Sequence, residues 1–152
     1  MITVILQNES HIQNVPSIHE FQQWADQTIK HIVKKIAKNC SEVCINIIDR
    51  NTSAQLNETY RHKQGATNVL SFPYESTPGI ANESLGDLAI CAAIVESEAP
   101  ENAIAAHWAH LTIHGLLHLV GYDHIVDTDA NIMEALEITI LNELGFENPY
   151  AV

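Results

Sequence analysis

The chain has 152 residues, of which 46% are hydrophobic, and a formal net charge of −12 at neutral pH. This length suffices for one domain with its own buried core, and we expect residues 1–152 to form that single domain. The acidic balance argues against a broad face for duplex nucleic acid, and no apolar run approaches the roughly 20 residues that span a bilayer.

The predicted elements follow from hydrophobic periodicity and from residues that begin or end helices. Ser17 followed by Glu20 is a capping-box pattern that begins a helix, and Gly145 ends the last one. A polar loop is predicted at residues 76–84. In chain order, we predict a strand at 2–6, a helix from 17 to about 38, a strand at 43–49, a helix at 51–60 with Asn51 as its cap, strands at 68–74 and 85–91, and helices at 92–99, 103–120 and 129–144.

The order of these elements predicts the fold class. Strands and helices alternate first, then two strands follow one another, and the last three elements are helices. This order favours an α+β fold, a mixed four-stranded sheet with about five helices packed on it, over a doubly wound fold.

The strongest motif lies at the end of the helix predicted at 103–120. His114 and His118 are four residues apart and therefore share one helical face, a spacing typical of zinc sites on helices. His110 cannot join both on one ion, because residues eight apart along a helix lie roughly 12 Å apart. Gly121 is suited to ending the helix in a tight left-handed turn, after which His124 can return as the third ligand. We therefore predict one zinc ion per chain on His114, His118 and His124, with a fourth position left for water.

The spacing His-x-x-x-His-x-x-Gly-x-x-His is also that of the metzincin zinc proteases. Those enzymes carry a glutamate directly after the first histidine as the general base. Gly115 occupies that position here, so the metal cradle is present and the protease base is missing. A peptidase is accordingly the least favoured of the functions considered.

The motif and several other segments resemble the YbeY family, bacterial metal-dependent endoribonucleases of ribosomal RNA maturation. His-Gly-x-x-His-Leu-x-Gly-Tyr-Asp-His at residues 114–124 is similar to the family signature. Residues 56–61 (Leu-Asn-Glu-Thr-Tyr-Arg), 67–73 (Thr-Asn-Val-Leu-Ser-Phe-Pro), 86–87 and 144–150 resemble family segments in the same order. The resemblance spans essentially the whole chain. It places the family's metal ligands on the three histidines and its functional arginine on Arg61.

The resemblance implies a zinc-dependent endoribonuclease that acts on single-stranded ribosomal RNA in 16S rRNA maturation and ribosome quality control. Ribosomal subunits or assembly factors are then the expected partners, without DNA or membrane. The alternative is a non-catalytic ribosome-assembly factor in which the histidine-bound zinc staples a turn. An open fourth position on the metal favours the enzyme, since structural zinc sites are closed by four protein ligands.

The distribution of charge bears on the RNA hypothesis. All seven basic residues lie within residues 1–63, against six acidic residues there, whereas residues 64–152 contain thirteen acidic residues and no lysine or arginine. A short single-stranded RNA end on a few cations fits this asymmetry better than a duplex does. A lone arginine after a helix, such as Arg61, is usually part of a surface ion pair. The resemblance to the family's functional arginine instead implies a phosphate ligand, a role that the guanidinium fork suits. Three lysines on the first predicted helix are more simply interpreted as a solvated face than as an RNA contact: Lys30, Lys34 and Lys38.

Some candidates keep two interpretations. Asp123, next to His124, could orient a ligand imidazole or act as the general base, or it could be an ordinary turn residue. His110 is expected to pack or to contact a ligand. Ser71 and Thr67 could line a cleft, although a nucleophilic role is disfavoured. Three cysteines, an odd number, and the absence of a basic N-terminal signal favour reduced thiols and a cytoplasmic protein.

Overall fold

We describe the protein from a computed structural model, in which residues 2–74, 83–100 and 102–151 are described. Most of the loop predicted at residues 76–84 lies outside these ranges. Among the described residues, no helix is long and apolar enough to cross a membrane.

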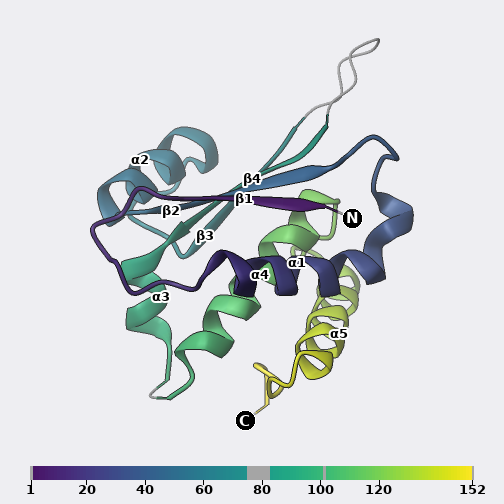
Figure 1. Cartoon of the computed structure of the whole chain (residues 1–152). Helices are drawn as coiled ribbons and strands as arrows, with labels where there is room; N and C mark the ends of the chain where they lie inside the picture. The colour runs from purple at the N-terminus through teal and green to yellow at the C-terminus, as the bar shows by residue number, and fades with distance from the viewer. Residues whose placement is uncertain (1, 75–82, 101, 152) are drawn as a thin grey trace.

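Within the described residues, one four-stranded sheet organises the fold (Figure 1). Its strands are β1 (Thr3–Asn8), β2 (Glu42–Ile48), β3 (Val69–Pro73) and β4 (Ser84–Cys91). The spatial order is β1-β2-β4-β3, with β1, β2 and β4 parallel and β3 antiparallel to β4. The predicted mixed four-stranded sheet is confirmed, and β3 lies at its edge.

In the part of the chain that the structure describes, five α-helices accompany the sheet, as predicted for an α+β fold. They are α1 (Ile18–Ile32), α2 (Arg50–Arg61), α3 (Ala92–Glu98), α4 (Ile104–Leu119) and α5 (Asp127–Glu143). The prediction for α1 was too long, because the chain passes into a short 3₁₀ turn at Val33–Lys35 and is extended at Ile36. Helix α5 begins two residues earlier than predicted.

The two predicted helix caps have different outcomes. At α1 the capping box is confirmed: the Glu20 amide donates to Ser17 Oγ at 3.2 Å and the Ser17 amide donates to Glu20 Oε1 at 3.0 Å. At α2 the prediction of Asn51 was wrong, since Asp49 occupies the cap position. The Asp49 carboxylate instead accepts from the backbone amide of His11 and contacts its ring.

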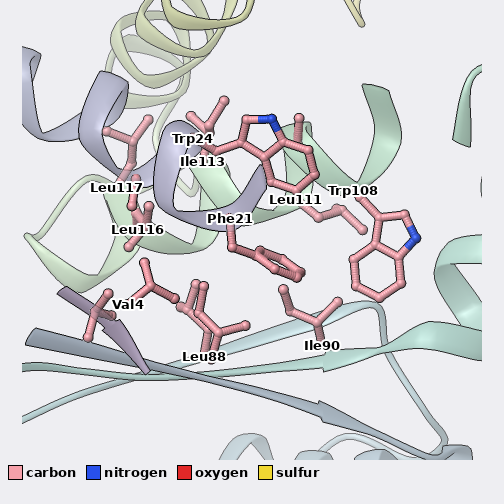
Figure 2. Packing of buried hydrophobic residues seen from close by; sticks show 14 of the residues in the cluster. Val4, Phe21, Trp24, Leu88, Ile90, Trp108, Leu111, Ile113, Leu116 and Leu117 are labelled. Carbon is pink, nitrogen blue, oxygen red and sulfur yellow. The ribbon is translucent and has the colours of Figure 1, made fainter. Parts of the chain in front are cut away.

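Helices cover both faces of the sheet, and α4 is the central one. Figure 1 shows α1, α4 and α5 on one face and α2 on the other. Helix α4 is apolar on most of its circumference because α1, α3, α5 and the sheet all pack against it. Figure 2 shows its Trp108 near Phe21 of α1, with ring centroids 6.0 Å apart, above Leu88 and Ile90 of β4. This dense core fixes the helix that carries the histidine motif.

Candidate metal centre and cavity

The histidine helix ends in the predicted glycine turn. Gly121 has a φ of +101°, in the left-handed region that side chains with a Cβ rarely adopt. Its amide donates to the carbonyl of His118, and the Tyr122 amide donates to the carbonyl of Leu117, both at 3.1 Å. These two bonds are those of a Schellman motif. The turn reverses the chain and brings His124 back to the last helical turn.

The three predicted ligands meet at one point. His118 Nε2 lies 3.1 Å from His114 Nε2 and 3.2 Å from His124 Nδ1, and all three nitrogens lie within 4.8 Å of one another. Nitrogens at 2.0–2.1 Å from a tetrahedral zinc ion are about 3.3 Å apart. The donor type and the two spacings that involve His118 therefore fit a tetrahedral zinc ion.

The environment of His118 favours a neutral imidazole. Burial, together with the neighbouring His114 and His124, lowers the pKa of His118 below its ordinary value of 6.5. A metal ligand must offer an unprotonated nitrogen. The packing of these rings thus keeps this nitrogen available near neutral pH.

The histidine cluster opens into a cavity of about 600 Å³. Helix α4 supplies two histidines from one face of the sheet, and the end of α2 supplies Asn57 and Arg61 from the other. The edge strand β3 forms the wall between them. The cavity is also lined by Lys63, Thr67, Asn68, Ser71, Asp123 and His124.

Arg61 is held at the rim of this cavity by the edge strand. Its Nη2 donates to the carbonyl oxygen of Ser71 at 2.5 Å, and its guanidinium carbon lies 5.7 Å from the centre of the Phe72 ring. An edge strand has backbone groups that no partner strand hydrogen-bonds. Arg61 donates to one of these groups, the carbonyl of Ser71. A guanidinium carries five N–H donors, so this bond leaves donors for a phosphate.

Two other sequence candidates have structural tasks. Asp123 Oδ1 accepts from the backbone amides of His124 at 2.6 Å and Ile125 at 3.3 Å, so this carboxylate orders the turn carrying the third histidine. Ser71 Oγ donates to the carbonyl of Gly115 at 3.0 Å, which ties β3 to α4. The lysines Lys30, Lys34 and Lys38 are exposed and lie outside the cavity lining.

Sequence reasoning missed Glu137, a fully buried carboxylate on α5. Its Oε1 lies 2.7 Å from Nδ1 of His114, and its Oε2 lies 3.2 Å from Nε2 of His110. The signal was available: Glu137 interrupts the buried face of α5 that also contains Met133, Ile140 and Leu141. A charged residue in an apolar helical stripe is buried only with partners. His110 contacts Glu137, which also contacts the predicted ligand His114. This contact agrees with the position of His110 one helical turn before His114.

Comparison with known proteins agrees with this architecture. The family model described as "Endoribonuclease YbeY" matches residues 5–145. Proteins named "Endoribonuclease YbeY" from Coxiella burnetii (strain Dugway 5J108-111) and Methylococcus capsulatus (strain Bath) are each 50% identical over 152 residues. The matches cover 99% of this chain in both cases, and 99% and 96% of those proteins.

A solved structure supports the fold independently. The solution structure of TM1509 from Thermotoga maritima matches with a TM-score of 0.55 and 19% identity. The match covers 97% of this chain and all of that one. At this identity the likeness concerns the fold alone. From the family model and the two half-identical relatives, it follows that the chain belongs to the YbeY endoribonuclease family.

Proposed function

We propose that this protein is a zinc-dependent endoribonuclease that cleaves single-stranded RNA and acts in the maturation of 16S ribosomal RNA. Membership of the YbeY endoribonuclease family makes it a nuclease, a hydrolase of phosphodiester bonds. The observation that carries the zinc proposal is the convergence of three histidine nitrogens on a cavity that also contains Arg61.

The chain's own residues have distinct tasks in this proposal. His114, His118 and His124 hold the metal, and the Gly121 turn sets the position of the third. When bound, zinc supplies Lewis acidity toward a phosphoryl oxygen and activates water for hydrolysis. Arg61, already oriented by Ser71 and Phe72, binds the phosphate and stabilises the charge that develops on it.

The shape and charge of the cavity favour a single strand. Arg61 and Lys63 are the two basic residues, lysine or arginine, that line the cavity, and Asp123 in the same lining is acidic. Two cations match one or two phosphates of a flexible strand, whereas duplex binding draws on many phosphate contacts.

The zinc-stapled assembly factor is the competing interpretation. A structural zinc has four protein ligands. Among the described residues, the group of metal-binding side chains at this point contains the three histidines alone. This open arrangement supports the enzyme.

The test compares a single-stranded RNA with its duplex, using zinc-loaded and chelator-treated protein. We expect cleavage of the single strand, loss with chelator and recovery with zinc. His114→Ala should lose both zinc and cleavage, whereas His19→Ala, an exposed histidine on α1, should keep both. Zinc binding without any RNA cleavage would favour the staple.

The place in ribosome maturation needs a cellular test. Replacement of the protein in its own host by the Arg61→Ala variant should cause 16S rRNA precursors to accumulate, as measured by Northern blotting. Normal rRNA processing in that strain would contradict this part of the proposal.

A further inference from the structure

The buried carboxylate of Glu137 connects three side chains from two parts of the chain. Its oxygens contact Nδ1 of His114 at 2.7 Å, Nε2 of His110 at 3.2 Å and the hydroxyl of Tyr150 at 2.7 Å. The carboxylate has no exposed surface. Of the ion pairs among the described residues, the His114–Glu137 pair is the one that includes a proposed metal ligand.

The same atoms could be read as a second metal site, because His110, His114 and Glu137 also lie within 4.8 Å of one another. The distances favour a hydrogen bond instead. Two ligand atoms on a tetrahedral zinc ion are about 3.3 Å apart, whereas the His114–Glu137 separation is 2.7 Å, the length of a charge-assisted N–H···O bond.

His114 has two ring nitrogens with different neighbours. Nε2 faces His118 Nε2 at 3.1 Å, inside the histidine cluster, while Nδ1 faces the carboxylate. A neutral imidazole carries its proton on one nitrogen only. A proton held on Nδ1 by Glu137 leaves the lone pair of Nε2 directed toward the cluster.

We propose that Glu137 is a positioning residue that holds His114 in the Nδ1–H tautomer, with Tyr150 and His110 fixing the carboxylate. This inference rests on the zinc site of the proposed function. A carboxylate behind a ligand imidazole orients the ring and raises its basicity, and removal of such partners typically weakens metal binding 10- to 100-fold.

The ionisation states agree with this geometry. Burial raises the pKa of Glu137, but the hydrogen bonds from His110, His114 and Tyr150 outweigh it and bring the pKa from 4.5 to about 2. Burial and the neighbouring Glu137 raise the pKa of the Tyr150 phenol. The carboxylate is therefore ionised and the phenol remains a donor.

The experiment measures zinc affinity by competition with a chromophoric chelator. Glu137→Gln preserves the shape but removes the charge, and Glu137→Ala removes the acceptor. Glu143→Gln is the matched control, because Glu143 is also on α5 and also contacts a histidine, His31 at 2.6 Å, but on the surface. We expect zinc binding to weaken about 10- to 100-fold in the two Glu137 variants and to remain unchanged in Glu143→Gln.

A second measurement reads the tautomer of His114 directly, in wild-type protein and in Glu137→Ala. In metal-free wild-type protein at pH 8, the ¹⁵N shifts of His114 should place the proton on Nδ1, and Glu137→Ala should lose this preference. A role in packing alone would lower the melting temperature without changing the tautomer or the zinc affinity.

The outcomes separate this inference from the proposed function. Wild-type protein that binds no zinc at His114 would refute the metal site itself. Wild-type zinc binding with an unchanged affinity in Glu137→Gln, or a His114 proton found on Nε2, would overturn the inference and leave the metal site intact.

Discussion

Arg61 belongs to α2, whereas His114 and His118 belong to α4, and these two helices lie on opposite faces of the sheet (Figure 1). All three residues line the cavity beside the edge strand β3. The guanidinium contacts the carbonyl of Ser71, not the histidine cluster. The phosphate-binding role that we propose for Arg61 is therefore separable from the proposed metal binding.

Replacement of Arg61 tests this separation. Arg61→Ala should leave zinc content and melting temperature nearly unchanged, as for other exposed residues. RNA cleavage should fall by about 10²-fold or more, since a preoriented charge stabiliser is lost. Cleavage kinetics and zinc content would be measured beside Arg50→Ala, an exposed arginine at the other end of α2. Wild-type cleavage by Arg61→Ala would show that the phosphate binds elsewhere.

Asp123 permits a similar separation between ordering the turn and acting as a base. Asparagine retains an oxygen that can accept from the His124 amide, but it is not a base. Because Oδ1 of Asp123 is bonded to that amide, we expect Asp123→Asn to retain zinc and to cleave RNA within about threefold of the wild-type rate. A 10²-fold loss of cleavage with full zinc content would instead assign Asp123 as the general base.

At this scale, sequence spacing predicted which histidines meet and which one does not. His114, His118 and His124 are close because local helix and turn geometry dictates it. Glu137 could be suspected from its place in an apolar stripe, but its contact with His114 depends on how α4 and α5 pack. Local patterns do not specify such packing.

At the scale of the elements, the histidine helix α4 approaches the sheet closely at Gly115. A Cβ on Gly115 would lie 2.9 and 3.1 Å from the methyl carbons of Leu88 and 3.2 Å from Val69. The position that bears the protease base in the metzincin pattern therefore faces the core strands. The protease base is therefore missing, and a side chain at this position would crowd Leu88 and Val69.

Gly115→Ala should destabilise the protein in spite of alanine's helix preference. Overpacking costs about 1–3 kcal/mol, against a propensity gain of up to about 1 kcal/mol, so we expect a net loss of about 1 kcal/mol in urea unfolding. Gly121→Ala is an informative comparison, because no atom lies near its Cβ and only the positive φ opposes it. A Gly115→Ala protein more stable than wild type would contradict this account of the packing.

Gly115→Glu restores the protease-like motif but should yield no peptidase. Its carboxylate would be directed at Leu88, so we expect poor folding and no cleavage of casein. Measurable casein cleavage by this variant would contradict the expectation.

Element boundaries were harder to predict than element types. The apolar spacing of α1 continues to residue 36, yet the helix ends at Ile32 because the chain must turn back to reach β2. No glycine or proline marks that point in the sequence, so local residue signals do not locate the end of the helix.

For the whole molecule, a net charge of −12 must be reconciled with an RNA substrate. The two cations of the cavity, Arg61 and Lys63, would provide about two phosphate contacts. Single-stranded binding changes by about −0.7 in log K per log salt for each phosphate, which predicts a slope near −1.4. Fluorescence anisotropy with metal-free protein would measure it. A slope of −4 or steeper would reveal a basic track beyond this cavity.

The histidine cluster also predicts how stability depends on pH. Because the folded pKa of His118 lies below 6.5, the unfolded chain binds more protons than the folded one as pH falls through this value. The free energy of unfolding of metal-free protein should therefore decrease from pH 7.5 to 5.5. Glu137 adds no slope there, since it is ionised in both states. His118→Gln should flatten the profile, and an equally steep profile in that variant would refute the assignment.

The link between His114 and Glu137 has a consequence for synthesis on the ribosome. A nascent chain that has emerged as far as His124 already contains the three histidines of the proposed zinc site, but the carboxylate behind His114 follows 13 residues later, on α5. Until α5 has emerged and packed on α4, His114 lacks its orienting partner. The zinc site that we propose would therefore become fully ordered only once α5 has packed on α4, a later event than the appearance of its three histidines.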